Sequence, residues 1–159
     1  MIWGRKAPEE VRLRQTAIDV ALKLASQSLP AETGGILIGW RTAEAVHVTR
    51  MLQVPDHEAT AASYQRNHEV AEAVLQQELA SPHVDPALGY VGEWHSHPAP
   101  LSASAQDRRE IASISRLAGG AIAMLLLARD AEAGWSIEAI TALSRKVGPA
   151  VVNIEEERK

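Results

Sequence analysis

The chain has 159 residues, no cysteine and a formal net charge of −4. This length suits one ordinary domain with its own core, and we expect a single domain over 1–159. The charge balance provides no broad basic surface for nucleic acid, and the lack of cysteine excludes disulfides, thiol nucleophiles and thiolate metal ligands.

The N-terminus lacks the apolar stretch of a signal peptide. The longest apolar run, at 120–128, is far shorter than the roughly 20 residues that a membrane span needs. We therefore expect a cytoplasmic protein that associates with neither nucleic acid nor a membrane.

The first half of the chain alternates between helical and strand patterns. A short strand is possible over 2–4, and apolar residues then recur at a helical period over 8–27. GGILIGW and AVHVTRMLQV predict an antiparallel pair of strands joined by a turn at 41–44. The polar segment 55–67 is expected to be a loop, and helical spacing returns over 68–80.

The second half begins with GYVGEWHSHP, a predicted strand that stops at Pro98. A helix is predicted over 104–117, and AIAMLLLA and GWSIEAITAL predict a buried central strand and its neighbour. Residues 149–159 end in EEERK and are expected to be a solvated tail. This element order predicts an α/β (α+β) fold, a single domain with a mixed β-sheet flanked by helices.

The segment GEWHSHPAPLSASAQD carries a candidate metal site. On a strand, His95 and His97 project to one face, roughly 7 Å apart at the backbone, while Trp94 projects to the other. A third ligand can come from Asp107 if the turn after Pro98 folds back. Two histidines and one carboxylate match a catalytic zinc site, in which the fourth position is left to water.

Simpler interpretations exist for the same residues. A His-x-His pair can be a surface coincidence, and Ser104 with Asp107 fits the Ser-x-x-Asp pattern that caps a helix. Capping and metal binding are compatible, because a helix start would also orient Asp107. The remaining histidines lie in strand, loop or helix contexts typical of solvated or packed side chains; they are His47, His57, His68 and His83.

The sequence His95-Ser96-His97-Pro98, followed by Ser104-x-x-Asp107, resembles the signature of the JAMM (JAB1/MPN/Mov34) zinc metalloprotease family. The family adds a glutamate upstream, and the element Glu32-Thr33-Gly34-Gly35-Ile36-Leu37-Ile38-Gly39 is similar to that feature. The resemblance spans roughly 17–143 and implies an MPN/cytidine-deaminase-like layered architecture.

The resemblance also implies a role for each residue of the signature. His95, His97 and Asp107 would hold Zn²⁺ and one water, Glu32 would accept and later return a proton, and Ser104 would donate a hydrogen bond to the oxyanion. Two alternatives stay open at this stage. The spacer APLSA is one residue shorter than the common form, so Ser102 could replace Ser104, and Glu93 could compete with Glu32 as the nearby acid.

The flanking run GYVGEWHSHP looks like that of compact bacterial JAB-domain proteins, including those encoded in antiphage operons beside ubiquitin-activating-like and ubiquitin-conjugating-like enzymes. The implied function is a zinc-dependent isopeptidase or peptidase that cuts after the C-terminus of a ubiquitin-like protein. One alternative is a processing protease for a ubiquitin-fold sulfur-carrier protein, and another is a non-catalytic MPN scaffold. Tyr64, Gln65 and Arg66 could touch a substrate tail, but nothing in their spacing requires it.

Overall fold

The computed structural model describes residues 6–157, so the strand expected over 2–4 lies outside the described residues. The described chain forms strands and helices that alternate through most of its length. In chain order they are β1 (Glu10–Arg14), α1 (Gln15–Ser28), β2 (Gly34–Arg41), β3 (Ala45–Gln53), α2 (His68–Leu79), β4 (Gly89–His97), α3 (Ala105–Ala118), β5 (Ile122–Asp130), β6 (Gly134–Leu143) and β7 (Lys146–Glu155).

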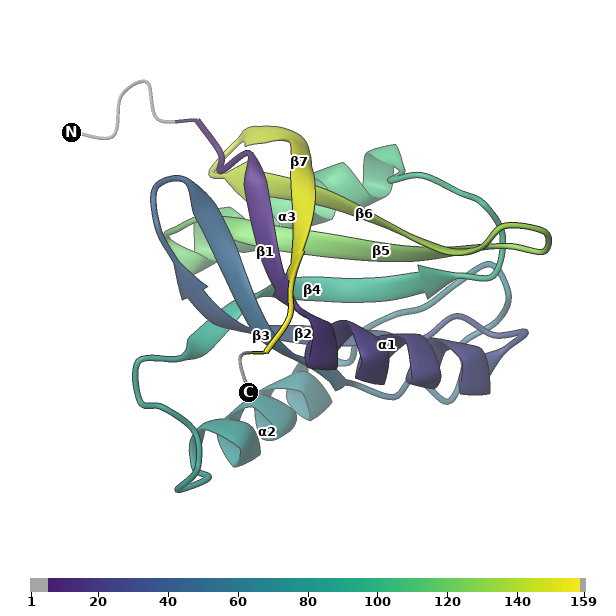
Figure 1. Ribbon diagram of the computed structural model, residues 1–159, viewed down its shortest axis with the longest axis horizontal. Coiled ribbons are helices and arrows are strands. Elements are labelled where there is room, and N and C mark those ends of the chain that lie inside the picture. The colour runs from purple at the N-terminus through teal and green to yellow at the C-terminus, as the bar shows by residue number, and fades with distance from the viewer. Residues whose placement is uncertain (1–5, 158–159) are drawn as a thin grey trace.

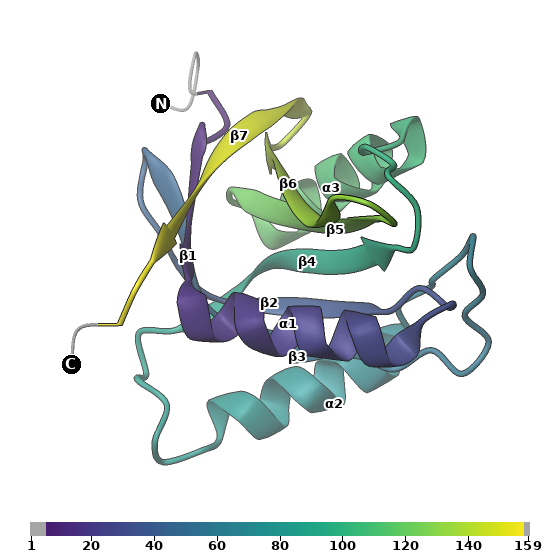
Figure 2. The same cartoon turned by 45° about the vertical axis from the view of Figure 1, so that its right-hand side comes forward.

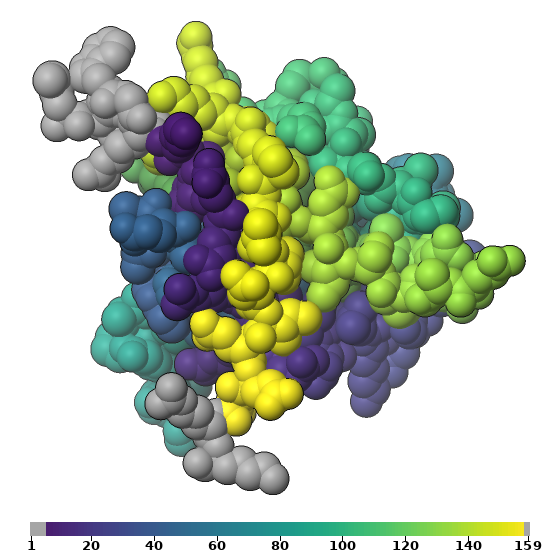
Figure 3. Space-filling model, turned by 45° about the horizontal axis from the view of Figure 1, so that its top comes forward, coloured from purple at the N-terminus to yellow at the C-terminus, as the bar shows by residue number. Residues whose placement is uncertain are grey.

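The strands form a closed barrel in the order β1-β3-β2-β4-β5-β6-β7. Strand β7 pairs in parallel with β1, and Figure 3 shows the two strands side by side. The predicted layered architecture, with a mixed sheet flanked by helices, is therefore wrong. Parallel and antiparallel pairs do coexist, but the sheet curls round and closes on itself.

The sequence patterns did not predict the two strands that close the barrel, β1 and β7. Residues 10–14 fell within the predicted helix over 8–27, yet they alternate between buried and more exposed positions and pair with β3 and β7. Residues 149–155 fell within the predicted tail, yet their backbone belongs to β7. Side chains on this part of β7 are mostly exposed. The composition of the segment therefore resembles that of a solvated chain end, although its backbone pairs within the barrel.

Apart from α1, which begins at Gln15 and not at residue 8, the elements between these two strands follow the predictions closely. Strands β2 and β3 form the expected antiparallel hairpin, and β5 and β6 are antiparallel neighbours. Helices α2 and α3 lie within one or two residues of the predicted bounds. Strand β5 is buried along nearly its whole length, as the continuous apolar run indicated.

The barrel interior is a single apolar core to which all the strands contribute. Helix α1 packs against it through Ala17, Ile18, Ala21 and Ala25. Two smaller clusters lie on the outer face, where α2 covers β2 and α3 covers β5 and β6. In Figures 1 and 2, α1 runs in front of the barrel strands, whereas α3 lies behind β5 and β6. Within the part of the chain that the structure describes, no helix is long and apolar enough to cross a membrane.

A β-bulge in β4 decides which of its side chains face outward. Gly92 pairs with Leu37, but the next partner of β2 is Tyr90, so Val91 is an extra residue. Val91 and Trp94 join the barrel core, while Tyr90 packs against the outer clusters. Beyond the bulge, simple alternation directs Glu93, His95 and His97 outward.

Candidate metal centre

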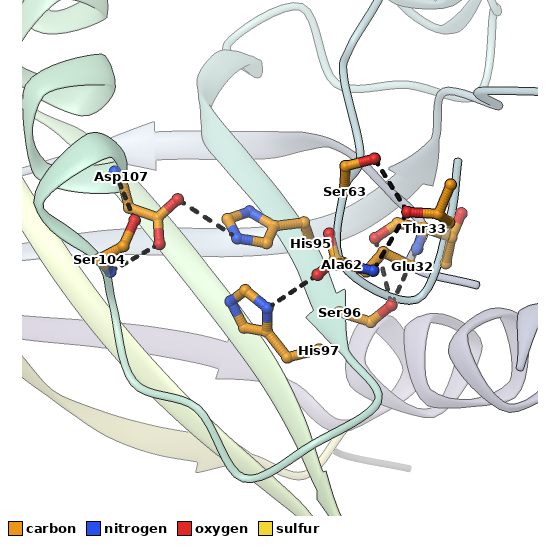
Figure 4. Close-up of polar contacts among 10 residues, drawn as sticks. Glu32, Thr33, Ala62, Ser63, His95, Ser96, His97, Ser104 and Asp107 are labelled. Carbon is orange, nitrogen blue, oxygen red and sulfur yellow. Dashed lines mark hydrogen bonds and ion pairs between the residues drawn. The ribbon is translucent and has the colours of Figure 1, made fainter. Parts of the chain in front are cut away.

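His95 and His97 project from the end of β4 on the outer face of the barrel (Figure 4). Their rings meet edge to face, with centroids 4.8 Å apart. Ser96 points inward and its hydroxyl accepts a hydrogen bond from the Thr33 backbone N–H at 2.9 Å. The Ser96 N–H donates in turn to the Thr33 carbonyl at 2.8 Å, which ties this end of β4 to the residue before β2.

Asp107 reaches the histidines from the first turn of α3. Ser104 is the N-cap of this helix: the Asp107 N–H donates to the Ser104 hydroxyl at 3.0 Å, and the Ser104 N–H donates to Asp107 Oδ2 at 2.8 Å. This capping box occupies Oδ2 and leaves Oδ1 directed at the strand, 3.5 Å from His95 Nε2. The Asp107 side chain thus takes part in the helix cap through Oδ2 and presents Oδ1 as a candidate metal ligand.

The three side chains fit a metal ion. Their ligand atoms lie within 4.8 Å of one another, and among residues 6–157 no other set of at least three His, Asp or Glu side chains converges in this way. His97 Nε2 is buried and has no hydrogen-bond partner among the described residues. A buried polar nitrogen left unpaired is costly, and a bound cation would satisfy it.

Burial keeps His95 in the form that metals bind. Burial lowers the pKa of His95 to about 4, against the opposing effect of Asp107, so its imidazole is neutral at physiological pH. The side chains of His95 and His97 are each 12% exposed, and that of Asp107 is 11% exposed. The ligands are therefore shielded but still reachable from solvent.

Glu32 lies directly beside the candidate ligands. Its Oε1 is 3.1 Å from His97 Nδ1, and with the proton on Nδ1, His97 donates to the carboxylate. This contact leaves the Nε2 lone pair of His97 free for a cation. Burial raises the pKa of Glu32, and the hydrogen bond from His97 acts in the opposite direction. A buried carboxylate with a raised pKa beside a metal site is suited to accepting and returning protons.

Residues 14–143 match the family model described as prokaryotic homologs of the JAB domain. The chain belongs to this family. The fold of this JAB domain is similar to the solution structure of protein DSY2949 from Desulfitobacterium hafniense, a Northeast Structural Genomics Consortium target. The TM-score is 0.66 at 19% sequence identity, over 92% of this chain and 94% of that chain. The comparison of this chain with curated protein sequences found no significant match.

The structure separates the two acids that the sequence left as alternatives. Glu32 contacts His97, whereas Glu93 is held by Tyr90 and Arg66. Ser104, not Ser102, caps α3 and lies next to Asp107. Of the remaining histidines, His47 stacks on Trp40 with ring centroids 4.5 Å apart, away from the metal centre.

Sequence reasoning missed the part that Arg66 plays. Its guanidinium Nε lies 2.8 Å from Glu93 Oε1, so it links segment 55–67 to the strand that carries the histidines. No local pattern indicates such a pair, because the two residues come from different elements and meet only in the fold. The raised pKa of Glu93, about 7, follows from burial and becomes visible only in three dimensions.

Proposed function

We propose that this JAB domain is a zinc-dependent isopeptidase or peptidase that hydrolyses the bond after the C-terminus of a ubiquitin-like protein or a similarly conjugated protein. The observation that carries the proposal is the convergence of His95, His97 and Asp107, in which the buried His97 Nε2 has no hydrogen-bond partner in the part of the chain that the structure describes. Two imidazoles and one carboxylate match the ligand set of catalytic zinc sites, which keep one position open.

Zn²⁺ held by these three residues would supply a Lewis acid for the scissile carbonyl and a water that is acidic enough to ionise near neutral pH. Glu32 accepts the proton of the attacking water and delivers it to the leaving amine, a task that suits its raised pKa. Ser104 Oγ accepts a hydrogen bond from the Asp107 N–H, so its own proton remains available to donate to the oxyanion.

The order of these groups in space supports a single reaction centre. Glu32 stands on the β2 side of β4, and Asp107 and Ser104 stand on the α3 side, with the two histidines between them (Figure 4). A carbonyl bound over the histidines would thus meet a proton carrier on one side and a hydrogen-bond donor on the other. No nucleophilic side chain of the chain is required.

The proposal can be tested by incubating the zinc-loaded protein with conjugates and linear fusions of ubiquitin-like proteins, followed by mass measurement of the products. We expect one cut directly after the modifier's last residue. A fusion of a ubiquitin-fold sulfur-carrier protein forms a second arm and separates precursor processing from conjugate cleavage. Failure to cut any substrate, or cleavage that survives Glu32→Ala, would overturn the proposal.

A further inference from the structure

Three side chains outside the metal centre form a buried polar cluster on the outer face of β4. Tyr90 donates from its hydroxyl to Glu93 Oε1 at 2.6 Å, and Arg66 Nε lies 2.8 Å from the same oxygen. The Glu93 side chain is 7% exposed and that of Arg66 is 22% exposed. The proposed reaction uses none of these groups, so the cluster needs another explanation.

Arg66 lies one residue before the end of segment 55–67, which we call the β3–α2 loop. Asp56 closes this loop on itself, because its Oδ1 accepts from the Glu58 N–H at 3.0 Å and its Oδ2 accepts from the Gln65 N–H at 2.9 Å. The loop is therefore a folded unit. An ion pair at one residue of such a unit can fix the position of the whole.

The β3–α2 loop touches the metal centre at two further points. The Glu32 N–H donates to the Thr60 carbonyl at 2.8 Å, so the loop holds the backbone of the proposed proton carrier. Tyr64 lies on the backbone of Gly34, the strand partner of His95: a Cβ atom at Gly34 would be only 2.6 Å from Tyr64 Cε1. The Tyr64 hydroxyl donates to the Val54 carbonyl at 2.7 Å.

The loop and α3 form the two walls of a cavity of about 450 Å³. This cavity, which we call the α3 groove, includes Gln106, the residue before Asp107 in the chain. The loop contributes Tyr64, Gln65 and Arg66, and α3 contributes Gln106, Arg109 and Glu110. Its polar lining and its place beside the metal centre suit a peptide backbone that approaches the reaction centre.

We propose that the Arg66–Glu93 ion pair is a positioning device that holds the β3–α2 loop as a preformed wall of the α3 groove and so sets the affinity for substrate. The inference rests on the proposed function, because it assigns the groove to the same substrate. Buried ion pairs add little net stability, but breaking one loosens the geometry it specifies. A wall that is already ordered spares the substrate the entropic cost of ordering it.

The test compares Arg66→Met with Arg50→Met. Arg50 forms the same kind of pair, 2.7 Å from Glu78, but joins β3 to the end of α2. Methionine keeps much of the arginine stem and removes the charge. For Arg66→Met we expect faster hydrogen exchange across 55–67 and a KM raised about tenfold, with kcat within about threefold of the wild type. Arg50→Met should change neither, and Tyr90→Phe should give a smaller effect in the same direction as Arg66→Met.

Equal exchange in the loop for Arg66→Met and Arg50→Met would overturn the proposal. Faster exchange with an unchanged KM would also overturn it, since the pair would then have only a structural role. If Arg66→Met does not fold, Tyr90→Phe decides by the same two measurements. If the wild-type protein cleaves nothing, the proposed function fails, while the exchange comparison still confirms or contradicts the ordering of the loop by the pair.

Discussion

Glu32 Oε1 lies 3.1 Å from His97 Nδ1, although the two residues are 65 positions apart in the chain. The register of the β2–β4 pair explains the contact. Gly34 stands opposite His95, and continuing this antiparallel register by two residues brings Glu32 opposite His97. A shift of one residue would turn the Glu32 side chain toward the other face, so the strand register itself brings the proposed proton carrier beside the candidate ligand.

Replacing Glu32 tests the proton carrier directly. Glu32→Gln preserves the size of the side chain and a hydrogen-bonding group for His97, but removes the basic oxygen. We expect kcat to fall by about 10²- to 10⁴-fold, the usual contribution of general acid–base catalysis, while one zinc ion per chain remains bound. Kinetics and metal analysis on the same preparation measure both. Loss of zinc in Glu32→Gln would show that Glu32 acts on the ligands and not on the proton.

Removing a ligand should abolish both zinc binding and turnover. In His97→Ala the site loses the buried Nε2 that has no hydrogen-bond partner among the described residues. Two remaining ligands hold zinc poorly, and we expect less than stoichiometric metal after dialysis. His47→Ala is the matched control, because His47 stacks on Trp40 and does not belong to the metal cluster. Equal zinc content in the two variants would contradict the assignment.

Ser104 caps α3 and is also the proposed oxyanion donor, and a second capping residue can separate these two roles. Ser104→Ala removes the side-chain cap of α3, and Asn67→Ala removes the cap of α2, where Asn67 accepts from the Val70 N–H. Each should lower the free energy of unfolding by about 1 kcal/mol. Only Ser104→Ala should also lower kcat, by about 10²-fold, as expected for the loss of an oxyanion donor. Equal kcat values in the two variants would show that Ser104 acts only as the N-cap of α3.

The stability of the metal-free protein should depend on pH through His95. Burial lowers its pKa to about 4, whereas an unfolded histidine titrates near 6.5. Between these values the unfolded chain binds a proton that the folded protein excludes. The contribution of neutral, buried His95 to the stability of the folded protein is therefore fully present above about pH 6.5. It is lost as the pH falls toward 4.

Comparison with His95→Asn isolates this effect. The comparison is needed because burial raises the pKa of Glu93 to about 7, which favours the folded state as the pH falls. Unfolding in the presence of a chelator at a series of pH values should show the wild-type protein losing stability relative to His95→Asn between about pH 6.5 and 4. Parallel curves for the two proteins would show that His95 is not buried in its neutral form.

Most individual elements could be predicted from the sequence, but the closure of the barrel could not. Hydrophobic periodicity located the β2–β3 hairpin and the β5–β6 pair, because local turns join both. Strands β1 and β7 come from opposite ends of the chain and pair with each other, with Glu10 opposite Val151. A pairing between the two ends of the chain leaves no local signal, and the alternation in a short strand also fits part of a helix.

The metal centre was more accessible to sequence reasoning than its surroundings. Strand alternation placed His95 and His97 on one face, and the need for a third ligand, which a turn after Pro98 could supply, pointed to Asp107. Each of these signals is local. The Arg66–Glu93 pair joins a loop to a strand, and its partners become apparent only when α2 has packed on β2.

The β-bulge at Val91 divides β4 into two segments. The inward and outward alternation of side chains in one segment does not continue into the other. Downstream of the bulge, residues 92–95 pair one to one with 34–37 of β2, and residues 92–97 pair with β5, so these two neighbours set the outward direction of the histidines. Upstream of it, the extra residue turns Tyr90 outward, although Tyr90 has the same parity as the inward Trp94. The connection that enters β4 from α2 can therefore be lengthened, shortened or exchanged in an engineered protein without rotating the metal ligands away from Asp107.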